Sequence, residues 1–403
     1  MVDEYRFQHP ETSQDYEQLY EVMRRSFPDE DVDIIVRRLV EHHPEMSNTD
    51  YFMVKHGDEA VAGLVLIPQK WSIDGVELNV AEMGCVGTVP EHRRKRIQWI
   101  LNKEFDEYAK SKGYDMCVLA GIPYFYRQFG YQYAVELDYE TKIEVNKLPE
   151  ETSLVSREFQ EEDVPQAQRL LEQTQNRYLV RSIRTPEIWK MQQETGTYGA
   201  EPFKSTAILD DHKLVAYYRW WVEEEVFNVK ELALKEDSYV EEISGCIRQQ
   251  AMKQGAEKIK TKLSHEDDFS KYLIERGAEK NKPYGWQIKL LDPRSFLEKL
   301  GPVFEKRLAD SEFKVLTKEL VMNFWKYKIK LEFKDGKLVS VENVSEAKRV
   351  LGMNPYASIQ LFLGFRSRED LEYAYPDFYI RGGNEGLIDV LFPRKPGYIH
   401  YCY

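Results

Sequence analysis

Cysteine is scarce in this sequence, and no two cysteines have the spacing of a metal-binding pair. The 403 residues include four: Cys85, Cys117, Cys246 and Cys402. Without a C-x-x-C pair, the spacing predicts neither a disulfide framework nor a metal site. The patterns of a zinc peptidase, a phosphate-binding P-loop and a Ser/His/Asp hydrolase are missing too. We therefore expect no metal cofactor, and we interpret Cys85 and Cys117 as buried thiols of core strands.

Long hydrophobic runs are also missing. No apolar segment approaches the roughly 20 residues that a membrane-spanning helix needs. The N-terminal segment is charged and has no apolar centre, unlike a signal peptide. We expect a cytoplasmic protein without a membrane partner.

Positive charge is in short supply. Lysine and arginine number 56 against 69 aspartates and glutamates, so the net charge is −13. An acidic protein is a poor non-specific binder of nucleic acid but suits a cationic substrate. The composition therefore argues against a nucleic-acid partner.

One short basic segment stands out against this background. Residues 83–89 form an apolar run that Pro90 closes, as expected of a strand, and His92-Arg93-Arg94-Lys95-Arg96 follows. Helical spacing then begins, with apolar or aromatic residues at Ile97, Ile100, Leu101, Phe105, Tyr108 and Ala109. Because a helix N-terminus favours negative charge, this basic segment indicates either a phosphate site or a solvated loop that enters the helix.

The segment resembles motif A of the GNAT superfamily of N-acetyltransferases. In that family an Arg/Gln-x-x-Gly-x-Gly/Ala turn cradles the pyrophosphate of acetyl-CoA. Arg93 matches the first position, whereas Arg96 and Gln98 replace the two small residues. Downstream, residues 125–131 (FYRQFGY) resemble the family's FYxxFGF/Y segment, whose tyrosine lies beside the thiol of coenzyme A. The resemblance implies an acetyl-CoA-dependent GNAT domain over residues 1–148.

The same resemblance implies a set of cofactor-binding residues. In the GNAT fold the strands on either side of the motif helix splay apart, and pantetheine satisfies the backbone groups left unpaired there, since buried N–H and C=O groups need partners. The implied acetyl-CoA contacts are Val86, Gly87, Thr88, Arg93, Arg94, Lys95, Arg96, Ile97, Gln98, Trp99, Gly121 and Ile122.

A similar order of elements returns after a polar linker at residues 147–153. We expect a helix over 163–175, strands over 207–209, 214–222 and 226–234, a helix over 239–253, and a strand over 259–263. The counterpart of the basic turn is Lys235-Glu236-Asp237-Ser238, which would repel phosphate. We interpret residues 149–290 as a second, degenerate GNAT-like domain.

The pattern changes again over residues 291–403. An amphipathic helix is expected over residues 296–308, and Asp335-Gly336 predicts a hairpin. Two GNAT-like units followed by such a region resemble the Eis (enhanced intracellular survival) family, which implies a sterol-carrier-protein-like third domain and a homo-oligomer, a hexamer. The expected fold class is α/β (α+β), with two tandem GNAT-like domains and a C-terminal sterol-carrier-protein-like α+β domain.

Two residues are candidates for the chemistry. Tyr126 is a candidate general acid, because a phenol pKa of about 10 lies close to that of a thiol leaving group; the alternative is an aromatic side chain that packs a core. The Eis resemblance implies that the carboxylate at the end of the chain, here on Tyr403, acts as general base. Ile399, Tyr401 and Tyr403 alternate like a tucked strand, and the alternative is an ordinary packed C-terminus.

The sequence thus predicts an N-acetyltransferase that acts on an aminoglycoside-like or polyamine-like amine. The alternative is a non-catalytic protein that senses acyl-CoA or docks a partner through a degenerate GNAT site, and Arg96 in the glycine position favours it. Lipid carriage by the C-terminal domain is a third option.

Overall fold

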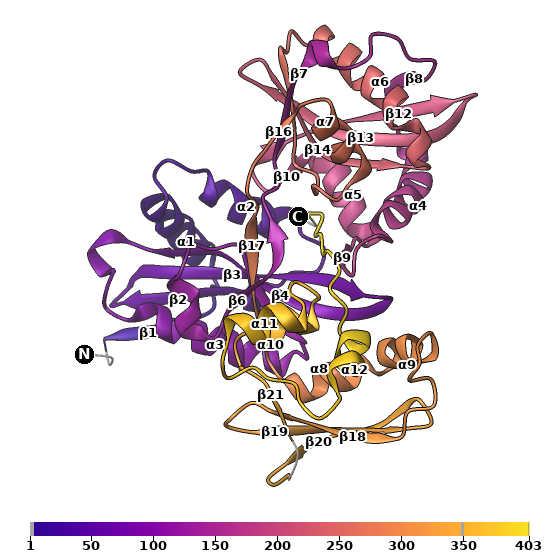
Figure 1. Ribbon diagram of the computed structural model, residues 1–403. Coiled ribbons are helices and arrows are strands. Elements are labelled where there is room, and N and C mark those ends of the chain that lie inside the picture. Colours follow the sequence, from indigo (N-terminus) through magenta and orange to yellow (C-terminus); the bar gives the residue numbers. More distant parts are fainter. Residues whose placement is uncertain (1–3, 348–349, 402) are drawn as a thin grey trace.

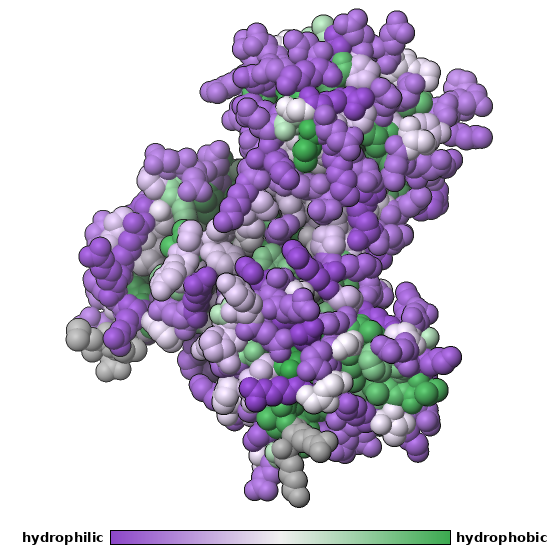
Figure 2. Space-filling view, viewed as in Figure 1, coloured by the Kyte–Doolittle hydropathy of each residue, from purple (hydrophilic) through white to green (hydrophobic). Residues whose placement is uncertain are grey.

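The chain folds into three lobes (Figure 1). The computed structural model describes residues 4–347, 350–401 and 403. The face in Figure 2 is mostly hydrophilic, with hydrophobic side chains in scattered patches. Within the described residues, no helix combines the length and the apolar character that crossing a membrane requires.

The first lobe is built on a sheet with the order β1-β2-β3-β4-β5-β17-β6, and β9 pairs with β3. Its strands are β1 (Tyr5–Gln8), β2 (Tyr51–His56), β3 (Glu59–Ile73), β4 (Val76–Thr88), β5 (Met116–Leu119), β6 (Gln132–Leu137), β9 (Val180–Ile183) and β17 (Tyr284–Leu290). Its helices are α1 (Ser13–Ser26), α2 (Val32–His42) and α3 (Ile97–Ser111). The motif helix therefore begins at Ile97, as predicted.

The second lobe repeats this arrangement. Its sheet has the order β16-β7-β15-β14-β13-β12-β8. The strands are β7 (Thr141–Glu144), β8 (Val155–Glu158), β12 (Lys204–Asp210), β13 (Lys213–Glu223), β14 (Val226–Leu234), β15 (Lys258–Thr261) and β16 (Glu279–Lys280). Helices α4 (Val164–Gln175), α5 (Pro186–Thr195), α6 (Val240–Lys253) and α7 (Asp268–Glu275) accompany it, with a short hairpin of β10 (Thr197–Tyr198) and β11 (Glu201–Pro202). Such a repeat of strand order is what the predicted duplication requires.

The two lobes exchange strands. β9 lies between α4 and α5 in the chain, yet it pairs with β3 of the first sheet. β17 follows the second lobe in the chain, yet it pairs with β5 and β6 of the first sheet. β7 follows the first lobe, yet it pairs with β15 and β16 of the second sheet. In Figure 1 the exchange is visible as an orange strand among purple ones and a purple strand among pink ones. The predicted boundary at residues 148/149 thus does not separate the sheets, because alternation along a strand does not specify its partner.

The third lobe is a four-stranded sheet of order β20-β19-β18-β21 with helices beside it. Its elements are α8 (Pro293–Lys299), α9 (Gly301–Ala309), β18 (Lys318–Asn323), β19 (Lys328–Lys334), β20 (Lys337–Val344), β21 (Leu351–Gly352), α10 (Ser358–Phe362), α11 (Arg368–Ala374) and α12 (Glu385–Leu391). The single helix expected over residues 296–308 is two helices, since Pro302 starts a new one instead of continuing the first. The core of this lobe is continuous with part of the first sheet.

Strands β4 and β5 create the opening in which the candidate site lies. They run parallel, and their pairs end at Glu82 with Val118. β4 continues to Thr88, whereas β5 stops at Leu119. Past Glu82 the two strands therefore separate, as a GNAT-like fold predicts.

Candidate active site

A cavity of about 800 Å³ lies where β4 and β5 separate. It is lined by residues of β4, the basic turn, the start of α3, the segment after β5 and the α1–α2 connection, together with Tyr403. Of the predicted cofactor-binding residues, the lining includes Val86, Gly87, Thr88, Arg93, Arg94, Arg96, Ile97, Gln98, Trp99, Gly121 and Ile122. Lys95 is exposed beside them and is not part of the lining. Both predicted catalytic residues, Tyr126 and Tyr403, line the same cavity.

The basic turn keeps a backbone that glycine normally adopts. Arg94 and Arg96 have φ angles of 64° and 62°, in the left-handed region that favours glycine. Arg96 is the residue before the first turn of α3, and that turn contains no acidic side chain. The side chain of Arg96 is exposed and does not fill the opening. The turn therefore has the shape of a phosphate-binding loop and adds cationic side chains to it.

Arg93 and Gln98 hold this turn against its neighbours. The Arg93 guanidinium donates to the carbonyl oxygens of Thr88 (3.1 Å) and Ser26 (3.2 Å). The Gln98 amide donates to the Thr88 hydroxyl at 3.0 Å. These contacts fix the turn to β4 and α1, and Arg94, Lys95 and Arg96 are exposed next to Arg93 at the helix start.

Tyr126 lies in a short 3-10 helix, Phe125–Phe129, with its ring buried against neighbouring aromatic rings. Gly121 allows this position, because a Cβ there would lie 2.4 Å from a carbon of the Tyr126 ring. Burial raises the pKa of the Tyr126 phenol to about 12. Its hydroxyl is therefore protonated at neutral pH and can act as a proton donor.

Tyr403 reaches the cavity from the other end of the chain. Its hydroxyl donates to Glu82 Oε1 at 2.7 Å, and its main-chain oxygen, part of the carboxylate, accepts from the Gly199 amide at 3.1 Å. Burial raises the pKa of the Tyr403 phenol well above its ordinary value. Figure 1 shows the C-terminus in the middle of the molecule, between the first and second lobes. The neighbouring Cys402 lies outside the described residues.

Glu82 is the residue that sequence reasoning missed. It is the last residue of β4 to pair with β5, its side chain is buried, and it also accepts from the Gln69 amide. Burial raises the pKa of the Glu82 carboxyl to about 7, although the hydrogen bonds from Tyr403 and Gln69 oppose that rise. A carboxylate between the apolar residues Ala81 and Met83 of a strand was the available signal.

Cysteine chemistry plays no visible part in the described site. Cys85 lines the cavity at an irregular point of β4, where its φ angle is 50°, and burial raises the pKa of its thiol to about 12. Cys85, Cys117 and Cys246 are free thiols. Among the described residues no group of three or more His, Cys, Asp or Glu could hold a metal ion.

Comparisons with known proteins agree with this geometry. Residues 9–134 match the family described as Acetyltransferase (GNAT) domain. The whole fold is similar to a GCN5-related N-acetyltransferase from Anabaena variabilis, with 16% identity, a TM-score of 0.74, and 98% of this chain and 99% of that chain covered. A GCN5-related N-acetyltransferase from Kribbella flavida is similar at 18% identity and a TM-score of 0.73, with 98% and 99% covered.

Eis1 from Mycobacterium abscessus also shares the fold, with 15% identity, a TM-score of 0.65, and 97% of this chain and 98% of that chain covered. No curated protein matches the sequence. The solved structures show that the whole chain shares their fold. The family match identifies residues 9–134, in the first lobe, as a GNAT acetyltransferase domain, and the protein is therefore an acyltransferase.

Proposed function

We propose that this protein is an Eis-type, acetyl-CoA-dependent N-acetyltransferase that acts on a cationic amine, with Tyr126 as general acid and the carboxylate of Tyr403 as general base. The observation that carries the proposal is that one cavity joins the basic start of α3, Tyr126 and Tyr403. These three parts come from distant segments of the chain, and acyl transfer needs all of them in one place.

The cofactor end of the cavity is suited to a diphosphate. The amides at the start of α3 and the exposed Arg94, Lys95 and Arg96 supply positive charge there. Toward the centre, β4 and β5 no longer pair, so backbone groups of residues 86–88 can bond an amide-containing arm such as pantetheine. The thioester would then lie toward Tyr126.

The acceptor end is formed by the α1–α2 connection, the start of α2 and Tyr403. Phe27, Val32 and Ile35 supply apolar surface, and Glu30 and Glu82 are the carboxylates in the lining. Together with the net charge of −13, these carboxylates favour a cationic amine. We propose an aminoglycoside-like or polyamine-like acceptor.

The reaction requires two proton movements. The neutral amine nitrogen attacks the thioester carbonyl carbon, and the carbon–sulfur bond of the resulting tetrahedral species then breaks. The Tyr126 hydroxyl donates its proton to the departing sulfur. The proton lost by the amine nitrogen passes to the Tyr403 carboxylate. Glu82 is a second acceptor in the same cavity and bonds to the Tyr403 hydroxyl.

The function is tested by binding and turnover together. Acetyl-CoA should raise the Tm of the purified protein through binding to the folded state, and thiol release should follow when a panel of amines is added. Kanamycin, spermidine and a neutral alcohol of similar size make a suitable panel. Tight binding of acetyl-CoA without thiol release from any amine would favour the acyl-CoA sensor, for which Arg96 in the glycine position is the supporting feature.

The pH dependence of Glu82 gives a second prediction. We expect the rate of acetyl transfer to rise as pH increases through about 7, the pKa of Glu82, because the carboxylate form can accept a proton. Glu82→Gln should remove this rise when rate profiles are measured with the same amine. Exposed Glu77, on the same strand, provides the control Glu77→Gln. A profile of Glu82→Gln that still rises as in the wild type would assign the titration to another group.

The same residue predicts an effect on stability. The pKa of Glu82 in the folded protein, about 7, lies above its ordinary value of 4.5. The stability that this proton contributes is fully present below pH 4.5 and is lost as pH rises through about 7. Glu82→Gln cannot ionise, so its Tm should exceed that of the wild type at pH 8 and not at pH 5. Thermal unfolding at both pH values measures this difference.

A further inference from the structure

The second lobe contains its own opening between parallel strands, and it is occupied by the chain itself. β14 and β15 pair from Val226 with Lys258 to Val229 with Thr261, and β14 then continues to Leu234. We refer to residues 396–401 and 403 as the tail. The Tyr398 hydroxyl donates to the Lys262 carbonyl oxygen at 2.7 Å, and the Lys230 ammonium lies 4.2 Å from the centre of the Tyr401 ring. The tail therefore contacts both strands directly beyond their last pair.

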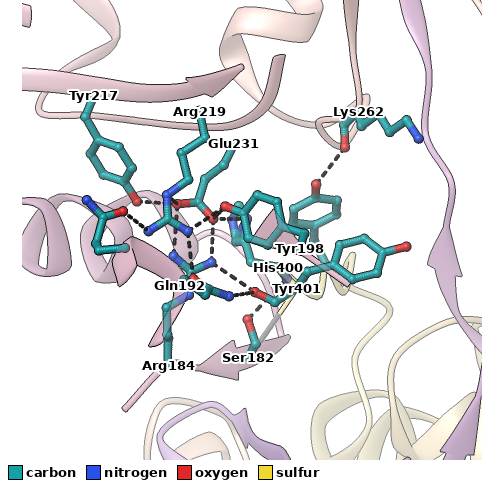
Figure 3. Close-up of polar contacts among 12 residues, drawn as sticks. Ser182, Arg184, Gln192, Tyr198, Tyr217, Arg219, Glu231, Lys262, His400 and Tyr401 are labelled. Carbon is teal, nitrogen blue, oxygen red and sulfur yellow. Dashed lines mark hydrogen bonds and ion pairs between the residues drawn. The ribbon is translucent and has the colours of Figure 1, made fainter. Parts of the chain in front are cut away.

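The tail backbone is held along its length (Figure 3). The Tyr398 amide donates to the Val180 carbonyl at 2.9 Å, and the His400 amide donates to the Ser182 hydroxyl at 3.1 Å. The Tyr401 carbonyl oxygen accepts two bonds, from Arg184 Nη2 at 3.1 Å and from Gln192 Nε2 at 3.2 Å. These contacts come from β9, the residue that follows it, and α5.

Arg184 and Gln192 are themselves held by a buried network. Arg184 Nη1 donates to Glu231 Oε1 at 3.0 Å, and Glu231 also accepts from the hydroxyls of Tyr217 (2.7 Å) and Tyr198 (3.1 Å). Burial alone would raise the pKa of the Glu231 carboxyl, but the guanidinium groups of Arg184 and Arg219 hold that pKa below its ordinary value. Figure 3 shows Arg184 and Arg219 beside Glu231, and Arg184 and Gln192 directed at the Tyr401 carbonyl oxygen.

Arg219 completes the support of Gln192. Its Nη1 donates to Gln192 Oε1 at 2.7 Å, and its Nη2 donates to Gln193 Oε1 at 3.2 Å. The side chains of Arg184 and Glu231 are 2% exposed and that of Arg219 is 0% exposed. Placing charges in such a site costs desolvation energy, so a hydrophobic cluster would often stabilise the fold as well. The charged network instead holds two hydrogen-bond donors, from Arg184 and Gln192, in place toward the Tyr401 carbonyl oxygen.

We propose that β9 of the first sheet and the second lobe together form a seat that positions the tail, and that Arg184 and Gln192 are positioning residues for acyl transfer in the first lobe. Two residues beyond the clamped Tyr401 carbonyl, Tyr403 contacts Glu82 and lines the cavity with Tyr126. The degenerate copy thus contributes to the reaction without binding a cofactor. This inference rests on the proposed acetyl transfer only for its effect on rate; the seating of the tail is independent of it.

Gln192→Glu tests the seat with little change of shape. The new side chain keeps an oxygen for Arg219, but it loses the N–H that donates to the Tyr401 carbonyl. We expect kcat to fall by about 10- to 100-fold, since small misplacements of a reacting group carry costs of this size. The Kd for acetyl-CoA should stay within about twofold, because Gln192 is not part of the cavity lining. Hydrogen–deuterium exchange of the tail peptide should become faster.

Gln193→Glu is the matched control. It adds the same charge one residue away and keeps the bond to Arg219. Ser182→Ala, which removes the acceptor for the His400 amide, is a second and independent variant. It should also speed exchange of the tail and lower kcat, and its Tm reports whether the fold is intact.

The outcomes are distinguishable. Faster tail exchange with a lowered kcat in Gln192→Glu and Ser182→Ala, but not in Gln193→Glu, supports the seat. Unchanged tail exchange in both variants overturns it, whether or not the protein acetylates amines. Faster exchange of the tail with a wild-type kcat overturns the positioning role of Arg184 and Gln192, but it does not contradict the proposed acetyltransferase activity. If the protein acetylates no amine, the proposed function is wrong. The exchange rate of the tail alone would then test whether the tail is held in the seat.

Discussion

Tyr126→Phe is expected to lower kcat for acetyl transfer by about 100-fold or more, the size of a general acid's contribution. The change removes the one hydroxyl that we propose donates a proton to the departing sulfur. Its ring should stay in place, because it packs against Gly121 and neighbouring aromatic rings. KM for acetyl-CoA and the Tm should therefore change little. Steady-state thiol release measures kcat and KM separately.

The fall in kcat caused by Tyr126→Phe should be the same at every pH between 6 and about 10. Burial raises the pKa of the Tyr126 phenol to about 12, so the hydroxyl is protonated from pH 6 to about pH 10. Tyr124→Phe is the matched control, since that tyrosine lies two residues away, is 76% exposed and is not part of the cavity lining. Tyr126→Phe with the kcat of the wild type would remove this residue from the chemistry and favour the interpretation of Tyr126 as a core residue.

Extending the chain beyond Tyr403 should be comparably damaging. A short glycine-serine segment turns the carboxylate into a peptide bond and adds backbone next to Tyr403, which lines the cavity. We expect kcat to fall by about 100-fold, as for a displaced reacting group, while the Kd for acetyl-CoA stays close to that of the wild type. Calorimetric binding of acetyl-CoA and amine turnover, measured on the same preparation, separate the two effects.

Tyr403→Phe distinguishes the two acidic groups of this residue. It keeps the carboxylate but removes the hydroxyl that donates to Glu82 Oε1 at 2.7 Å. The kcat of Tyr403→Phe should fall less than that of the extended protein. Its pH profile should shift to higher pH, because Glu82 loses a hydrogen-bond donor that lowers the pKa of its carboxyl. An extended protein with full activity would exclude the carboxylate, and Glu82 would then be the remaining acceptor in the cavity.

The local features of the first lobe could be predicted from sequence because each depends on neighbouring residues. The start of α3 at Ile97 follows from a switch to helical spacing, and the 3-10 segment around Tyr126 follows from a motif of seven residues. The arginine at position 96 also kept the left-handed backbone of the glycine that it replaces. The family resemblance placed Tyr403 in the site, which composition and periodicity alone could not.

Features that depend on distant partners could not be predicted. In the sequence, Glu82 is an acidic residue of a strand with no sign of a special role. Its partner Tyr403 lies 321 positions away and contacts it only in the folded protein. Arg184 and Glu231 look like ordinary surface charges in sequence, although they are among the most buried charged groups described. Helix α5 was missed because its last residues are polar; the helix buries its own Trp189, and its Gln192 donates to the tail.

The strand exchange has a consequence for how the protein is made. β17 completes the first sheet between β5 and β6, yet it lies after the whole second lobe in the chain. During synthesis, the basic turn and Tyr126 are therefore translated long before β17, the strand that joins β5 to β6 in their sheet. Until then β5 and β6 present unpaired edges, which are aggregation-prone. The first lobe is thus the first to be translated, but its sheet cannot be completed until the second lobe has been synthesised.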